Sequence, residues 1–179
     1  MSKLAPQAVV SDIPQALQRA LASHRQGRLV EAEKIYARIL KSVPSHFDAL
    51  HLLGALKLQT GKVGEASRLL TAALEINPRS TDTLTNLGLV LRALNRNAEA
   101  LARFDQALAL DPAHVEARNN RGLVLLMDKR TEEALACFDE VLRLEPRHPA
   151  RVNRGNALAG KLQLRAVTEG LESKNLQLF

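Results

Sequence analysis

Apolar residues recur along residues 81–114 with the spacing of two successive amphipathic helices. In the first half, the apolar and small positions at i, i+3, i+4 and i+7 are Leu84, Leu87, Gly88 and Leu91. In the second half, one helical face carries Ala100, Phe104, Ala107 and Leu108. Positions with this spacing share one side of an α-helix, and Asp111-Pro112 ends the second run because proline lacks an amide hydrogen. The pattern predicts two antiparallel helices joined by a short turn.

The same pattern recurs at a constant interval along the chain, and each copy ends at a proline: Pro44, Pro78, Pro112 and Pro146. Small residues follow or precede these prolines at fixed distances: Gly54, Gly88 and Gly122, and Ala32, Ala66, Ala100 and Ala134. Small residues let paired helices approach to the lower end of the ~8–10 Å range. A larger residue in each copy can then fill the space beside them: Tyr36, Leu70, Phe104 and Phe138. Repetition at a fixed period of this size predicts a stack of similar helix pairs.

These glycine, alanine, aromatic and proline positions resemble the tetratricopeptide repeat, and the resemblance extends from residue 13 to about residue 165. It implies an all-α, right-handed superhelical solenoid of antiparallel helix pairs, whose first helices line a concave groove that binds peptides or partner proteins. The expected organisation is an N-terminal tail at 1–12, repeats at 13–46, 47–80, 81–114 and 115–148, and a degenerate fifth repeat or C-terminal cap at 149–179. A truncated further repeat is the alternative for the last segment.

Two sequence segments, HFDALHLLG and NNRGLVL, are similar to the repeats that precede the catalytic part of bacterial O-linked N-acetylglucosamine transferase-like (Spindly-type) proteins. This narrower resemblance implies an alternative role as the substrate-recognition region of such a glycosyltransferase. A tetratricopeptide-type secretion chaperone is a second alternative. The leading expectation is a non-catalytic scaffold that binds another protein or an extended peptide segment.

The amino-acid composition limits the classes of partner that the chain is expected to bind. The net charge is +6, from 25 Lys and Arg against 19 Asp and Glu, but much of the excess lies in predicted turns, so nucleic acid is an unlikely partner. No apolar run approaches the ~20 residues needed to span a bilayer, so we expect no membrane partner. The opening MSKLAPQAVV does not read as a secretory signal. A cytoplasmic protein is therefore expected.

Residues that hold the same position in successive repeats form a column along the predicted stack. The first candidate binding feature is a column of asparagines. Asn86 and Asn120 lie one repeat interval apart, and Asn153 occupies the slot in the displaced fifth segment, while Gln18 and Leu52 hold it earlier. An asparagine amide both donates and accepts, so it can hold a peptide backbone whatever the bound sequence. The resemblance to the transferase-like proteins implies such an asparagine ladder. The alternative is that these amides satisfy a neighbouring loop or helix end.

Two further columns accompany it. The first consists of the acids Asp48, Asp82 and Glu116, which lie in the first turn of predicted helices. Either the helix dipole favours negative charge at these positions, or the three acids bind basic side chains of a partner. Leu21, Ala55, Leu89 and Leu123 form either an apolar floor for a partner's side chain or part of the core.

In the tetratricopeptide repeat family, a carboxylate clamp holds the tails of chaperones. At the positions of that clamp, this chain has His51, Thr85 and Asn119 instead, so we expect no binding of such tails. His51 and Asn119 nevertheless join the predicted partner-binding set on the concave face.

The remaining polar residues have structural interpretations. Arg118 and Arg121 recur as Arg151 and Arg154, and we expect their guanidinium groups to pair with acids of the preceding second helix, such as Asp105 or Asp139. His46, His114 and His148 each follow a proline by two residues and are expected in turns or helix caps. The chain lacks phosphate-loop, zinc-helix, nucleophile-turn and CxxC motifs. We therefore expect no catalytic residues, no cofactor and no metal site.

Overall fold

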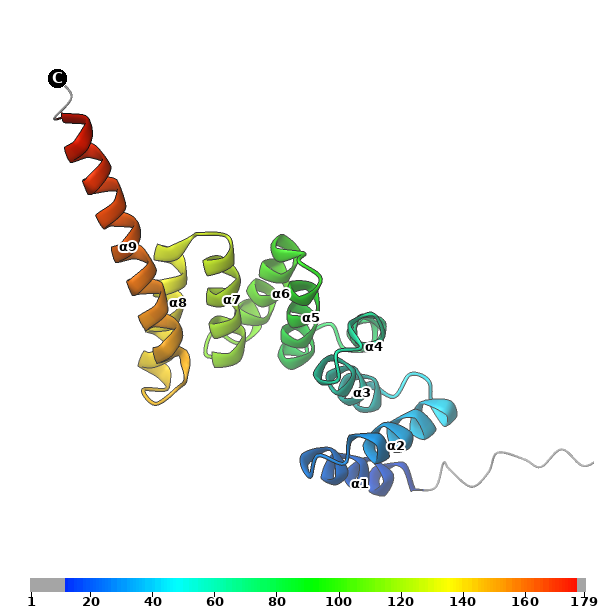
Figure 1. The fold of residues 1–179 in the computed structure, drawn as a ribbon. Helices are drawn as coiled ribbons and strands as arrows, with labels where there is room; N and C mark the ends of the chain where they lie inside the picture. The colour runs from blue at the N-terminus through cyan, green and yellow to red at the C-terminus, as the bar shows by residue number, and fades with distance from the viewer. Residues whose placement is uncertain (1–11, 177–179) are drawn as a thin grey trace, which may run out of the picture. The chain divides into compact units, whose positions relative to one another are not determined.

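The computed structural model describes residues 12–176, with side chains placed for residues 12–163. Over this range the chain forms α-helices joined by short turns and contains no strand, which confirms the all-α prediction (Figure 1). The helices are α1 (Ile13–Arg25), α2 (Leu29–Ser42), α3 (Phe47–Gln59), α4 (Val63–Ile76), α5 (Thr81–Ala93), α6 (Asn97–Leu110), α7 (Val115–Met127), α8 (Thr131–Leu144) and α9 (Ala150–Leu176). The predicted tail at 1–12 lies almost entirely outside the described residues.

Local sequence explains where the first helices begin. Ser80 precedes α5, and its hydroxyl accepts a hydrogen bond from the amide of Thr83. His46 and His114 occupy the same position before α3 and α7, where each Nδ1 atom accepts from the amide three residues later. His148 accepts from the amide of Ala150 at the start of α9. These bonds satisfy amides that have no partner within the helix, and they confirm the predicted turn and cap roles of the histidines.

The turn inside each helix pair has one backbone conformation. Gly27, Gly61, Asn95 and Lys129 all have positive φ, at 75°, 74°, 58° and 60°, and they lie at equivalent positions of the repeat. Glycine adopts this conformation without steric cost and asparagine at little cost. The repeated geometry reverses the chain after each first helix.

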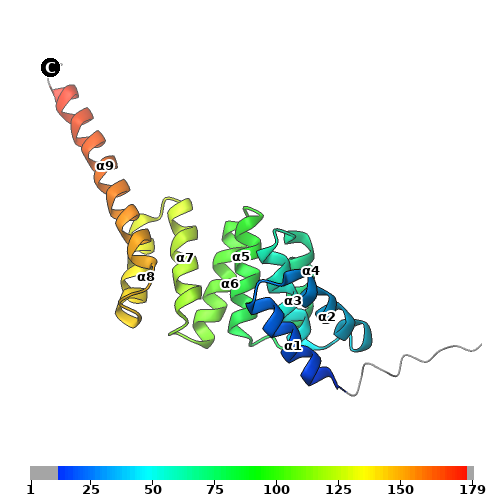
Figure 2. The ribbon, with the colours of Figure 1, turned by 60° about the horizontal axis from the view of Figure 1, so that its bottom comes forward.

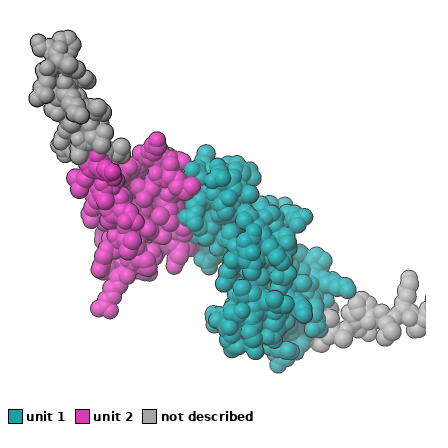
Figure 3. All heavy atoms as spheres, viewed as in Figure 1, with its two compact units in different colours: residues 1–103 teal, residues 104–179 magenta. Residues whose placement is uncertain are grey.

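The chain divides into two compact units, residues 1–103 and residues 104–179, with the division inside α6 (Figure 3). In unit 1, the helices pack successively from α1 to α5. In addition, α3 contacts both α1 and α5, so the first helices of successive pairs are neighbours. In unit 2, α8 packs between α7 and α9, and α7 also contacts α9 (Figure 2).

The predicted fit of small against large residues is confirmed in both units. A Cβ atom on Gly54 would lie 2.8 Å from the Cγ and Cδ2 atoms of Leu70. A Cβ atom on Gly122 would lie 2.6 Å from Cε1 of Phe138. In the first pair, Ala20 takes the glycine position and is buried in one cluster with Tyr36. Close helix contact in these three pairs therefore depends on the absence of a bulky side chain at these positions.

The last segment is a single helix. α9 runs for 27 residues, whereas the first helices α3, α5 and α7 each have 13 (Figure 1). A Cβ atom on Gly155 would meet no atom within 4 Å, because no second helix of the described chain packs on that side. Val152 and Leu162 are accordingly 65% and 66% exposed.

Candidate interaction site on the first helices

A groove of about 250 Å³ lies between the first helices α1 and α3 of unit 1. Its lining residues are Leu17, Gln18, Leu21, Asp48, His51 and Leu52. The groove brings together members of all three predicted columns: Gln18 and Leu52, the acidic Asp48, and the apolar Leu21. The lining therefore combines three leucines with three polar or acidic side chains.

His51 is held in place by a short polar chain. Its Nδ1 atom lies 2.9 Å from the Thr83 hydroxyl, which in turn lies 2.8 Å from the Ser80 hydroxyl. The imidazole ring also stacks on Phe47, with ring centroids 6.1 Å apart. These contacts join α3 to the start of α5 and fix the orientation of the ring at the groove.

Burial lowers the pKa of His51, and the nearby carboxylates of Asp82 and Asp48 only partly oppose this. The ring is therefore neutral at neutral pH. It adds no positive charge beside Asp48, which is the exposed carboxylate of the groove lining. The groove lining therefore carries one acid and no cation.

The neighbouring helix α5 supplies two half-buried candidates, Asn86 and Leu89. Thr85, at the position equivalent to His51, is buried and donates a hydrogen bond to the Thr81 carbonyl at 2.8 Å. Its hydroxyl therefore serves its own helix.

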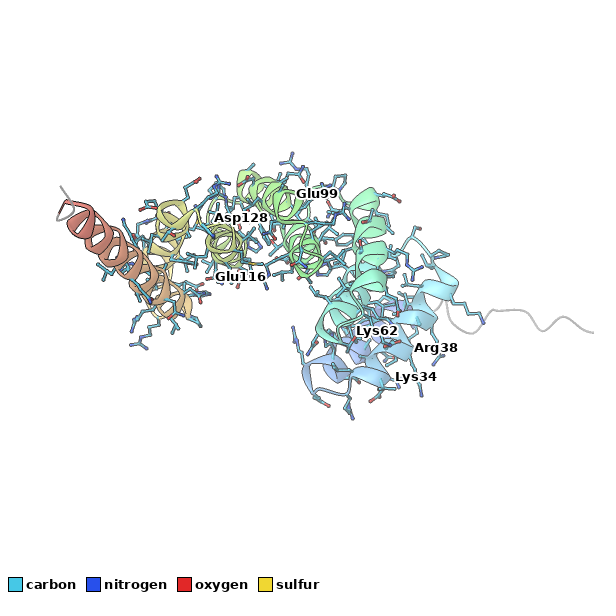
Figure 4. All side chains as sticks on the ribbon, turned by 45° about the horizontal axis from the view of Figure 1, so that its top comes forward. Lys34, Arg38, Lys62, Glu99, Glu116 and Asp128 are labelled. Carbon is cyan, nitrogen blue, oxygen red and sulfur yellow. The ribbon has the colours of Figure 1, made fainter. Side chains whose placement is uncertain are left out.

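In unit 2, the side chain of Glu116 projects from α7 and is 70% exposed (Figure 4). The amide of Asn120 donates to the Glu116 carbonyl at 2.8 Å, within the same helix. The amide of Asn153 donates to the side-chain oxygen of Asn119 at 3.1 Å and so joins α9 to α7. Leu123 is half-buried. Asn86 belongs to unit 1 and Asn120 to unit 2, so an asparagine ladder stays a prediction.

Arg121 and Arg154 form the predicted ion pairs. Nε of Arg121 lies 2.7 Å from Oδ1 of Asp105, and Arg154 pairs in the same way with Asp139. Arg118 and Arg151 instead donate to the carbonyls of Pro112 and Pro146, where the preceding helix has ended and no helical amide is available. All four guanidinium groups thus have structural partners.

The sequence prediction missed Leu17 and Thr83. Leu17 could have been found, because it stands one repeat interval before His51 and so shares its phase in the repeat. Thr83 contacts His51 only because α5 packs beside α3. The spacing of residues along the sequence does not predict this packing. Within the described residues, no group of three or more His, Cys, Asp or Glu side chains could hold a metal ion. The helices of this range include none long and apolar enough to cross a membrane.

Two models of the tetratricopeptide repeat match the sequence, at residues 23–86 and 85–149, and together they cover most of the chain. The chain belongs to the tetratricopeptide repeat family. A search of curated proteins found no match.

Solved structures of tetratricopeptide repeat proteins share the fold. MamA from Desulfovibrio magneticus RS-1 superposes with a TM-score of 0.76 at 17% identity, over 93% of this chain and 94% of that one. YrrB, described as a TPR protein with an unusual peptide-binding site, gives 0.67 at 25% identity, over 88% and 85%. The O-GlcNAc transferase of Thermobaculum terrenum gives 0.72 at 26% identity over 80% of this chain, which spans only 27% of that protein.

Proposed function

We propose that this tetratricopeptide repeat chain is a non-catalytic scaffold that binds an extended segment of another protein along its first helices. The observation that carries the proposal is the groove between α1 and α3, where the predicted apolar, acidic and polar columns meet. The similarity to YrrB supports it, because that protein is described as having a peptide-binding site.

The size of the groove sets what it can hold. A volume of about 250 Å³ is below the ~300–1,000 Å³ of typical small-molecule sites, so it suits one or two side chains of a bound segment. Leu17, Leu21 and Leu52 would contact an apolar side chain, and Asp48 would attract a neighbouring basic one. Because His51 is already fixed by Thr83, little ordering entropy is lost on the receptor side.

The other candidates would hold parts of a bound partner, each within its own unit. Asn86 on α5, and Asn119, Asn120 and Asn153 in unit 2, carry amides that can pair with a peptide backbone. Leu89 and Leu123 would offer further apolar contacts, and Asp82 and Glu116 further negative charge.

Affinity purification from the native cell tests this proposal. Wild-type protein is compared with a groove variant, Asp48→Lys/Leu21→Gln, and a column variant, Asn86→Ala/Asn120→Ala. The control Glu145→Lys/Leu94→Gln makes the same change of charge and polarity at exposed turn positions. Circular dichroism shows that each variant is folded. We expect the partner to be lost with the groove variant, reduced with the column variant and retained with the control. Recovery of identical proteins with all four would show that the first helices do not bind the partner.

The similarity to the Thermobaculum terrenum O-GlcNAc transferase favours a second candidate, in which the chain recognises substrates for a glycosyltransferase. A glycosyltransferase reading frame directly downstream of this sequence would support that role. Its absence, together with partners that carry no sugar modification, would count against it.

A further inference from the structure

A second hollow lies on the opposite side of α3, between the second helices α2 and α4. It has a volume of about 380 Å³, and its apolar lining consists of Ala37, Leu53, Leu69 and Ala72. At 3.6 residues per turn, Leu53 and Lys57 lie on the face of α3 opposite to Asp48 and Leu52. We call this hollow the α2–α4 trough. It is separate from the groove between the first helices.

The charges around Lys57 cancel. Nζ of Lys57 lies 2.8 Å from Glu33 and 2.6 Å from Glu65, and Nζ of Lys62 lies 3.8 Å from Glu33. Two carboxylates thus balance two ammonium groups. Neither Glu33 nor Glu65 is left to neutralise cations on the outer face of α2.

The outer face of α2, which adjoins the side of the helix that carries the lining residues Glu33 and Ala37, has a surplus of positive charge. Lys34, Arg38 and Lys41 are spaced at i, i+4 and i+7 on α2, so they share one face, and all three are exposed. Figure 4 shows Lys34 and Arg38 on α2, with Lys62 nearby. In the part of the chain that the structure describes, the Lys34, Arg38 and Lys41 side chains form no ion pair. Glu31, the other acid of α2, pairs with Arg28 at 3.2 Å. Exposed Arg68, which lines the trough from α4 near Glu65, adds a fourth cation.

We infer that the α2–α4 trough is a docking surface for an acidic amphipathic segment of another protein. Small aliphatic residues of the segment would contact Ala37, Leu69 and Ala72, and its carboxylates would pair with Lys34, Arg38 and Lys41. Helical spacing of the three cations matches a partner helix that carries acids along one edge. Single-stranded nucleic acid fits less well, because the trough has no aromatic side chain on which a base could stack.

Fluorescence anisotropy of the full chain tests this inference. The probe is a labelled peptide of about 14 residues, close to the length of α2, with Leu at helical spacing and Glu beside it. Its twin carries Gln in place of Glu. We expect the acidic peptide to bind and the Gln twin to bind at least about tenfold more weakly, with an affinity that falls as salt rises.

Variants then locate the binding. Lys34→Glu/Arg38→Glu should weaken binding of the acidic peptide by about tenfold or more, because two attractions become repulsions. Arg19→Glu/Arg79→Glu makes the same change of net charge at exposed positions outside the trough and should leave affinity within about twofold. The groove variant Asp48→Lys/Leu21→Gln should also stay within about twofold, which separates this surface from the proposed function.

Two results would overturn the inference. The acidic peptide could fail to bind the wild type, or both charge-reversal variants could weaken its binding equally. If the peptide fails while labelled single-stranded RNA or phosphatidylserine vesicles bind through Lys34 and Arg38, the surface binds one of those ligands instead.

Discussion

Lys57 occupies a position that belongs to the core. The equivalent positions of the next two repeats hold Leu91 and Leu125, which are 5% and 0% exposed. The Lys57 side chain is also buried, at 7% exposure, and its ammonium lies 2.8 Å from Glu33 and 2.6 Å from Glu65. These two carboxylates are 33% and 44% exposed, so only the cation is removed from water.

This asymmetry predicts opposite effects for two substitutions. Glu33→Gln/Glu65→Gln leaves the Lys57 ammonium buried without a counter-charge, at a cost of about 3 kcal/mol. For a chain of this size, that cost lowers the midpoint of thermal unfolding by about 6–12 °C. Lys57→Leu removes the buried charge and leaves two carboxylates that water can still reach. We expect its stability to be unchanged or higher, because apolar replacement of a buried ion pair is often neutral or stabilising.

The dependence on pH gives an independent check. Burial by itself lowers the pKa of Lys57, but hydrogen bonds to Glu33 and Glu65 outweigh it and raise the pKa above the usual 10.5. The hydrogen bond from Lys57 lowers the pKa of Glu65 below its usual 4.5. The lysine contribution to stability is therefore complete below pH 10.5 and is lost as pH rises through its raised pKa. The Glu65 contribution is complete above pH 4.5 and is lost as pH falls through its lowered pKa. In Lys57→Leu, stability should therefore change less with pH, both at high pH and at low pH.

Thermal unfolding followed by circular dichroism measures both effects. Glu31→Gln serves as the control, since it removes an exposed partner of Arg28 and should leave the midpoint unchanged. The reasoning is refuted if the Glu33→Gln/Glu65→Gln variant melts with the wild type, or if Lys57→Leu lowers the midpoint as much as that variant does.

Three further substitutions test how small and large residues pack along the repeats. Gly122→Ala should destabilise by about 1–3 kcal/mol, because the new methyl would overlap Phe138, whereas Gly155→Ala meets open space and should stabilise α9 by up to about 1 kcal/mol; equal urea midpoints for the two would contradict the pairing. Tyr36→Phe should raise stability by about 1 kcal/mol, because the Tyr36 hydroxyl is buried without a hydrogen-bond partner in the described chain and Phe104 and Phe138 fill the same position elsewhere. A loss of stability in that variant would reveal a partner for the hydroxyl.

Much of the fold is encoded in local spacing and could be predicted. The regular recurrence of proline, glycine and alanine predicted helix pairs and the contact between Gly122 and Phe138. The three histidines after the prolines were assigned to turns and caps, where the structure places them. Interactions of this kind involve residues close in sequence, or residues related by the repeat itself.

Contacts between helices were harder to predict. The Asn119–Asn153 bond and the donation from Arg118 to the Pro112 carbonyl depend on how side chains meet across a turn or a neighbouring helix. The continuous helix α9 also departs from the pattern, because Gly155 lies next to no second helix of the described chain.

By itself, the sequence determined the helices, their pairing and the residues that keep each pair close, because these follow from periodic local rules. Only the tertiary structure decided that Leu17 and Leu21 meet Asp48 and His51 in one groove, and that Lys57 is buried between Glu33 and Glu65. The reason is physical: the repeat spacing fixes which face of its own helix a side chain occupies. How deeply that side chain is buried, and which residues it contacts, depend on the helices that pack against that face.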